Sequence, residues 1–146
     1  MRILAVPAFA RCLKSLDFSA ADVRAAIEDM NNGLVHANLG SGLFKQRVAR
    51  PGTGKRGGHR IVLAFRAHDR AILLYGFPKA KRATLSKDET AALKKLAAKL
   101  LAYDASQIAR ALQSGALVKL VEHDEFADND PDQTEGPIKP DPGDGP

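Results

Sequence analysis

Cysteine, tryptophan and aromatic side chains are scarce in this chain of 146 residues. A single cysteine, Cys12, excludes an internal disulfide and a multi-cysteine metal site, and it suits a reducing compartment such as the cytoplasm. The absence of tryptophan and an aromatic content of 5% argue against a base-stacking platform for single-stranded nucleic acid. Apolar runs fall short of the roughly 20 residues that cross a bilayer, so we expect a cytoplasmic protein with no membrane partner.

Acidic residues are almost missing from the middle of the chain. Between Lys45 and Arg82 there are eleven lysines and arginines and a single acid, Asp69. Residues 122–146 are the reverse, with nine acids and one base among many prolines and glycines. The basic stretch predicts a polyanionic partner, of which nucleic acid is the commonest. The acidic stretch cannot bury enough surface to order itself, so we predict one domain over residues 1–121 and a disordered tail over residues 122–146.

The hydrophobic pattern predicts an alternation of strands and helices. The expected elements are a strand at 3–6, helices that start at Pro7 and Ser19, strands at 43–49, 59–66 and 71–77, helices that start at Ser86 and Asp104, and a short strand at 117–121. Capping boxes mark the second and third helix starts. This order predicts an α+β fold, in which two N-terminal helices pack on a small antiparallel sheet and one or two C-terminal helices follow.

A glycine-rich segment at residues 51–58 invites comparison with phosphate-binding loops. The sequence predicts a loop here that carries Lys55 and Arg56. A Walker motif requires serine or threonine after its lysine and a glycine where this chain has Ala49, so we expect no nucleotide cofactor. The four histidines show no metal-ligand spacing, so we expect no metal cofactor either.

Strand alternation gathers cations on one face of the expected sheet. Lys45 and Arg47 are two residues apart and share a face of their strand. On the next strand, Arg60 and Arg66 share a face, whereas His59 belongs with the apolar, core-facing residues. Such a face is either an ordinary solvated surface or a patch on which a ribose-phosphate backbone can lie. The scarcity of acids around it favours the second interpretation.

Three segments resemble a known family of bacterial toxins. They are Leu43-Phe44-Lys45-Gln46-Arg47, then Gly54-Lys55-Arg56-Gly57-Gly58-His59-Arg60-Ile61-Val62, then Leu74-Tyr75-Gly76-Phe77 with Lys79. Together with the helix after Ser86, they resemble the RelE/ParE superfamily, and most of all the HigB-like subgroup with its G-K-x-G-G-x-R segment between two strands. The resemblance covers residues 1–121 and leaves the acidic tail outside.

The resemblance implies a compact toxin of a type II toxin–antitoxin system, whose partner is a cognate antitoxin. RelE-like members cut messenger RNA in the decoding site of the ribosome, and ParE-like members inhibit DNA gyrase. The Lys-x-Lys that RelE-like toxins carry on the first strand of the meander is Lys45-Gln46-Arg47 here, and their arginine on the next strand is Arg60. They often place a tyrosine after the last strand, but no tyrosine follows here before Tyr103.

The basic stretch supplies the residues that we expect to bind RNA. They are Lys55, Arg56, Arg66, Lys79, Lys81 and Arg82.

Cleavage of RNA without a metal uses the 2′-hydroxyl of the substrate as nucleophile, and it needs a base, an acid and cations around the phosphate. Arg47 and Arg60 would hold phosphate oxygens, because a guanidinium group binds two of them at once. Lys45 would accept a proton, because neighbouring cations favour its neutral form. Histidine titrates near neutral pH, so His59 is a further candidate acid or base.

The leading prediction is therefore a metal-independent, ribosome-associated mRNA endonuclease toxin. Two alternatives remain open: a ParE-like inhibitor of DNA gyrase, and a family member without catalysis that only binds its antitoxin. The trio of Lys45, Arg47 and Arg60 favours the nuclease, and the missing tyrosine favours the non-catalytic member.

Overall fold

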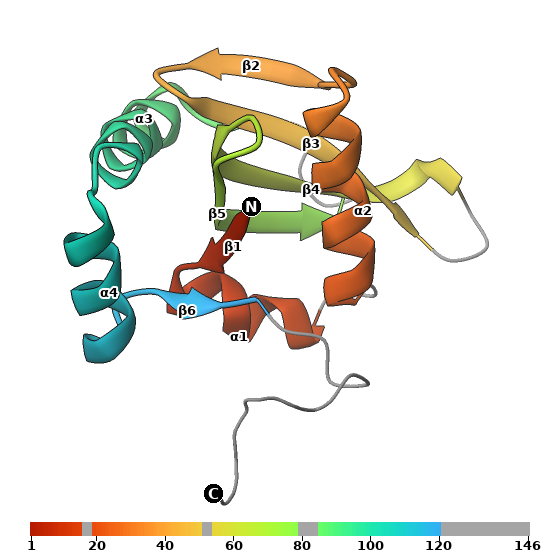
Figure 1. Ribbon diagram of the computed structural model, residues 1–146. Helices are drawn as coiled ribbons and strands as arrows, with labels where there is room; N and C mark the ends of the chain where they lie inside the picture. The colour runs from red at the N-terminus through yellow and green to blue at the C-terminus, as the bar shows by residue number, and fades with distance from the viewer. Residues whose placement is uncertain (16–18, 51–53, 79–84, 121–146) are drawn as a thin grey trace, which may run out of the picture.

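The computed structural model describes residues 1–15, 19–50, 54–78 and 85–120. Within these ranges, four helices lie on one six-stranded sheet, whose strand order is β2-β3-β4-β5-β1-β6 (Figure 1). The elements are β1 (Arg2–Ala5), α1 (Pro7–Ser15), α2 (Ala20–Asn31), β2 (Ala37–Gly40), β3 (Leu43–Arg50), β4 (Gly54–Arg66), β5 (Arg70–Pro78), α3 (Lys87–Leu101), α4 (Ala105–Ser114) and β6 (Val118–Lys119). The α+β class that the sequence predicts is confirmed.

The sheet is mostly antiparallel, with one parallel pair. The meander of β3, β4 and β5 is antiparallel throughout, as predicted. β1, however, runs parallel to β5, from Arg2 opposite Arg70 to Ala5 opposite Leu73. The prediction of a purely antiparallel sheet is therefore wrong for β1. Parallel pairing needs a long crossover connection, and the helices and strands between β1 and β5 supply it.

Two strands of the meander region differ from prediction. β2 has no predicted counterpart, because Ala37–Gly40 lacks the β-branched and aromatic residues that mark strands. It forms because the turn at Ser41 and Gly42 folds it back on β3. β4 begins at Gly54, within the predicted loop, because its main-chain pairing with β3 reaches Arg50 opposite Gly54 and needs no side chains.

Capping boxes begin three of the helices. In α3, the backbone N–H of Ser86 donates to the Glu89 carboxylate at 2.9 Å, and the N–H of Glu89 donates to Ser86 Oγ at 3.1 Å. Equivalent reciprocal pairs begin α2 and α4. Each such cap stabilises its helix by about 1 kcal/mol. The predicted helix starts at Ser19, Ser86 and Asp104 are therefore confirmed as N-caps.

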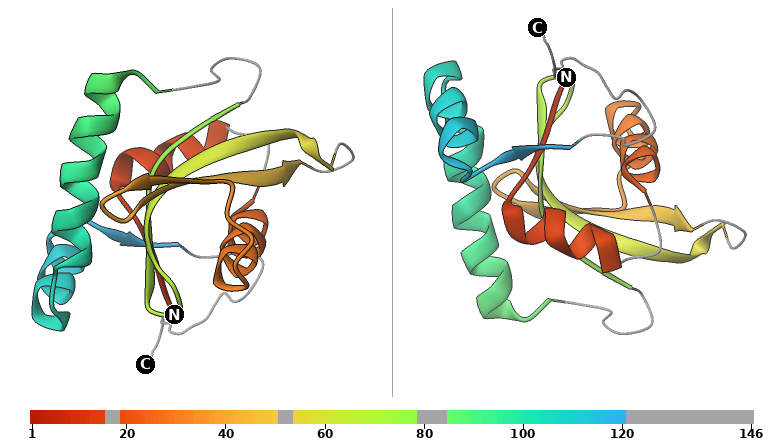
Figure 2. Two further views of the ribbon diagram at one scale, coloured as in Figure 1. Left: turned by 90° about the horizontal axis from the view of Figure 1, so that it is seen from above. Right: turned by 90° about the horizontal axis from the view of Figure 1, so that it is seen from below.

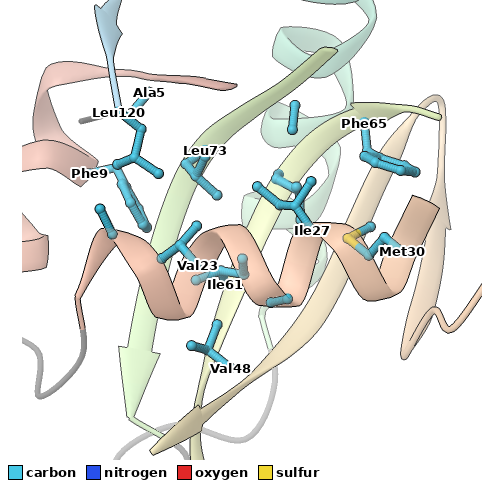
Figure 3. Close-up of a cluster of buried hydrophobic side chains, with 14 residues drawn as sticks. Ala5, Phe9, Val23, Ile27, Met30, Val48, Ile61, Phe65, Leu73 and Leu120 are labelled. Atoms are coloured by element: carbon cyan, nitrogen blue, oxygen red, sulfur yellow. The ribbon is translucent and has the colours of Figure 1, made fainter. Parts of the chain in front are cut away.

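Alternating residues of the sheet face two separate cores. On one face, Phe9 of α1 and Val23 and Ile27 of α2 pack against Ile61 of β4 and Leu73 of β5 (Figure 3). On the other face, α3 and α4 pack against the sheet, and the helix pairs lie on opposite sides of the strands (Figure 2). That second core is built from Leu4, Leu43, Val62, Ala64, Ile72, Leu74, Phe77, Ala97, Leu100, Ile108, Ala111 and Leu117.

The C-terminal end of α3 is tied to the β4–β5 turn by two arginines. Arg70 donates from Nη1 to the carbonyls of Leu100 and Tyr103, at 3.2 and 2.8 Å. Arg66 donates from Nη2 to the Leu101 carbonyl at 2.8 Å. Helix C-termini present carbonyls without intrahelical partners, and cations there are stabilising. The two guanidinium groups therefore hold α3 at one end of the sheet.

We expect Arg70→Ala to lower the free energy of unfolding by about 2 kcal/mol, because the Arg70 side chain is 12% exposed and satisfies two helix carbonyls. Arg66→Ala is the matched control, since its side chain is 52% exposed and water replaces its bond readily. Its cost should stay below about 1 kcal/mol. Urea denaturation of both variants measures the difference, and equal losses would contradict this account.

Candidate nucleic-acid interface

Three cations meet on the face of the sheet that α3 and α4 partly cover. Arg47 of β3 lies directly opposite Arg60 of β4, and Lys45 lies one step along the same face, opposite Val62. Strand alternation predicts this grouping, and the strand register produces it. We call Lys45, Arg47 and Arg60 the cationic cluster. Like charges directly opposite each other destabilise a sheet, so the pair opposes folding rather than supporting it.

The two arginines of the cationic cluster carry donors that their surroundings leave unused. Arg60 is only 7% exposed, and its Nη1 is buried without a hydrogen-bond partner in the described part of the chain. The same holds for Nε of Arg47. A buried donor without a partner costs about 1–3 kcal/mol. These two nitrogens are themselves covered, but two opposed guanidinium charges suit a ligand that is anionic and rich in acceptor oxygens, as a phosphate group is.

Electrostatics give the same indication at Arg60. Burial lowers the pKa of Arg60 from its ordinary value, and the neighbouring charge of Arg47 lowers it further. Arginine nevertheless remains a cation in proteins. The charge is thus held in a place that disfavours it, and an anion bound between the two guanidinium groups would relieve the repulsion.

A histidine that the sequence analysis does not single out lies beside the cationic cluster. His36 precedes β2, and its backbone N–H donates to Oε1 of Gln46 at 2.8 Å. Burial lowers the pKa of His36, and the charges of Arg47, Arg60 and Lys45 lower it further. The sequence does contain an indication of this position. The turn that follows Gly40 implies a strand before it, and such a strand would bring residue 36 beside β3.

Two aromatic rings share the face of the cationic cluster. Tyr75 lies opposite Val62, and Phe77 lies opposite Arg60. Their ring centroids are 5.6 Å apart. The pairing of β4 with β5 shifts by one residue between Val62 and Leu63, and this shift turns Tyr75 to the same side. The family pattern often has a tyrosine after the last strand of the meander, whereas Tyr75 lies within β5. Phe77 is buried in the core, so of the two rings only the partly exposed one of Tyr75 is suited to stacking on an unpaired base.

A comparison with protein families matches residues 1–120 to the RelE toxin of the RelE/RelB toxin–antitoxin system. The chain belongs to the RelE toxin family. This confirms the resemblance to the RelE/ParE superfamily, and the match leaves the acidic segment outside, as the resemblance does. No curated protein matches the chain. The protein is therefore the toxin of a toxin–antitoxin pair, and its partner is a cognate antitoxin.

The remaining predicted site residues of the toxin lie apart from the cationic cluster or outside the described residues. His59 is buried on the opposite face, opposite Val48. Arg66 is at the far end of β4, about 20 Å along the strand from Arg60. The side chains of Lys55 and Arg56 lie outside the described residues, as do Lys79, Lys81 and Arg82 entirely.

The described residues contain no group of three or more histidine, cysteine, aspartate or glutamate side chains that could hold a metal ion. In the same part of the chain, every helix is too short or too polar to cross a membrane.

Proposed function

We propose that the toxin inhibits translation by cutting messenger RNA on the ribosome, with the cationic cluster as its phosphate site. The observation that carries the proposal is the directly opposed pair of Arg47 and Arg60, whose Nε and Nη1 donors have no hydrogen-bond partner among the described residues. Phosphate oxygens are acceptors of the right charge and number for such donors. Membership of the RelE toxin family supports the same substrate.

The cluster contains groups suited to each part of a metal-independent cleavage. The 2′-hydroxyl of the substrate attacks the adjacent phosphorus, and negative charge grows on the phosphate oxygens in the transition state. Arg47 and Arg60 stabilise that charge, because their fixed donors are already oriented. Lys45 lies one step along the face and is placed to exchange a proton with a reacting oxygen. Tyr75, which is partly exposed, offers a ring on which a neighbouring base can stack.

A gyrase inhibitor that works by binding a protein surface has no need of two directly opposed arginines that each keep one donor without a partner in the described part of the chain, so the geometry favours the nuclease. A family member without catalysis remains the competing reading, because it would retain the same charged face while only binding its antitoxin. The two differ in whether message is cut, and that difference can be measured directly.

We expect that inducing the toxin without its antitoxin produces new messenger ends inside codons that occupy the decoding site. Mapping of 5′ ends in induced cells detects them, and a 5′-hydroxyl paired with a 2′,3′-cyclic phosphate identifies attack by the 2′-hydroxyl. Purified gyrase should supercoil DNA normally in the presence of the toxin. Inhibited gyrase with intact messages would support the ParE-like alternative, and intact messages with active gyrase would leave a non-catalytic protein.

A further inference from the structure

A hollow at the end of β2 lies next to the cationic cluster. β2 pairs with β3 only from Ala37 opposite Lys45 onward, so the chain before Ala37 approaches the edge of β3 without joining the sheet. The hollow has a volume of about 410 Å³. Its walls are Gly33, Leu34, Val35, His36, Gln46 and Arg47. His36 and Arg47 thus line the same hollow, and Arg47 is the member of the cationic cluster in its walls.

A buried amide holds the His36 side of this hollow in place. Gln46 is 4% exposed, and its Oε1 accepts a hydrogen bond from the backbone N–H of His36 at 2.8 Å. Its Nε2 donates to the carbonyl of Leu34 at 2.9 Å. Both ends of the amide thus bind the segment before β2. A buried polar group with its bonds satisfied fixes local geometry, so Gln46 sets where His36 lies.

The charged groups that act on His36 are all cations. They are Arg47 and Lys45 of β3 and Arg60 of β4, and no acidic group contributes in the described part of the chain. Together with burial, these charges lower the pKa of His36 from 6.5. At neutral pH the imidazole is therefore uncharged, and a neutral imidazole has a nitrogen that is free to accept a proton.

We propose that His36 contacts the bound RNA in this hollow and accepts the proton of the attacking 2′-hydroxyl, with Gln46 as its positioning residue. This inference rests on the proposed nuclease function. The O–H bond of the 2′-hydroxyl breaks, and its proton goes to His36. The 2′-oxygen then forms a bond to phosphorus while the bond from phosphorus to the 5′-oxygen breaks. The leaving 5′-oxygen takes a proton from the ammonium group of Lys45, which is thus the proton donor rather than the acceptor expected from the sequence, and exchange with water restores both side chains.

The test is single-turnover cleavage of message on programmed ribosomes by the full-length toxin, measured from pH 5 to 8. We expect His36→Gln to lower the cleavage rate at pH 7 by about 10²–10⁴-fold, as loss of a general base does. Wild-type cleavage should fall at acidic pH as His36 becomes protonated, and the variant should lose this dependence. His68→Asn, in the exposed β4–β5 turn, is the matched control and should keep both the rate and the profile.

A second pair of measurements separates contact with the substrate from a structural effect. His36→Ala leaves space in the hollow, so added imidazole should restore part of its cleavage rate in proportion to the neutral imidazole present. Binding of a 2′-deoxy message analogue, which cannot be cut, should change less than about threefold in either variant, since the arginines hold the phosphate. Failure of imidazole to rescue His36→Ala, or an unchanged pH profile in His36→Gln, would overturn the inference.

Gln46→Glu tests the positioning residue. A carboxylate there would favour the imidazolium form of His36, so the acidic fall in cleavage should move to higher pH. An unmoved fall would remove Gln46 from the proposal. These outcomes are distinct from failure of the proposed function: if wild-type toxin cuts no message, the nuclease itself is wrong, whereas active His36→Gln beside inactive Arg60→Met would refute only the role of His36.

Discussion

Replacing Arg60 with methionine should lower the rate of message cleavage by about 10²–10³-fold, the usual cost of removing one preoriented donor from a transition-state oxyanion. The reason is its position. Arg60 is 7% exposed and lies directly opposite Arg47. A lysine on the exposed surface therefore cannot replace its charge at this position. Single-turnover cleavage on programmed ribosomes measures the effect, and survival of cells that express the variant without antitoxin reports it independently.

The same substitution should leave the fold as stable as before or raise the free energy of unfolding by about 1 kcal/mol. Methionine fills a similar volume, and it removes a buried charge that faces Arg47 with a donor unsatisfied. Loss of cleavage with retained stability would mark Arg60 as functional. If the variant no longer folds cooperatively at room temperature, Arg60 is instead needed for the core. If the variant keeps full toxicity, the proposed role of Arg60 in cleavage is wrong.

Lys45→Ala offers a comparison within the same cluster. Lys45 is partly exposed, and its neighbour across the strands is the apolar Val62. If it transfers a proton, its loss should reduce cleavage while RNA binding weakens only as much as loss of one phosphate contact does. A plot of log binding constant against log salt concentration should then have a slope that is smaller by about the contribution of one phosphate contact.

Gly42→Ala should lower the free energy of unfolding by about 2–4 kcal/mol, the largest stability effect that we expect from adding one methyl group. Gly42 has a φ of +80°, where a Cβ costs about 1–2 kcal/mol. A Cβ at this position would also overlap Cδ1 of Leu101, at the end of α3. Crowding of that kind adds about 1–3 kcal/mol. The turn cannot move away freely, because the N–H of Phe65 donates to the Gly42 carbonyl at 2.9 Å.

Gly33→Ala separates the two contributions to the Gly42 effect. Gly33 has a similar φ of +88°, but nothing lies within 4 Å of the position that its Cβ would take. Its cost should therefore be the backbone strain alone, about 1 kcal/mol. Thermal and urea denaturation of both variants measure the difference. Equal losses would mean that Leu101 yields without cost and that α3 is not packed tightly on the turn.

The grouping of cations on one face of the sheet could be predicted from sequence, because it follows from strand alternation. A period of two residues needs no tertiary information, and it separates Arg60 from Ile61 and Lys45 from Phe44. The capping boxes are also local patterns, and they located the starts of α2 and α3 within one residue, as the segment that begins at Asp104 located the start of α4.

Pairing partners and strand ends are set by contacts between distant segments, so the sequence could not supply them. β2 is formed from residues with little strand preference, and only its partner stabilises it. His36 was missed for that reason, since its place beside Arg47 follows from β2 and from the amide of Gln46. Tyr75 was missed because a shift in the β4–β5 register turns it to the cationic face.

The two-faced character of β4 limits how this protein can change in length. Every even step along the strand from Arg60 meets one helix layer, and every odd step meets the other. A single residue inserted between Arg60 and Leu63 would exchange the two sets on one side of the insertion, unless the strand absorbs it in a bulge as β5 does opposite Val62 and Leu63. Changes in the length of β4 should therefore occur in pairs of residues or together with a bulge, whereas the ends of the hairpin are under no such constraint.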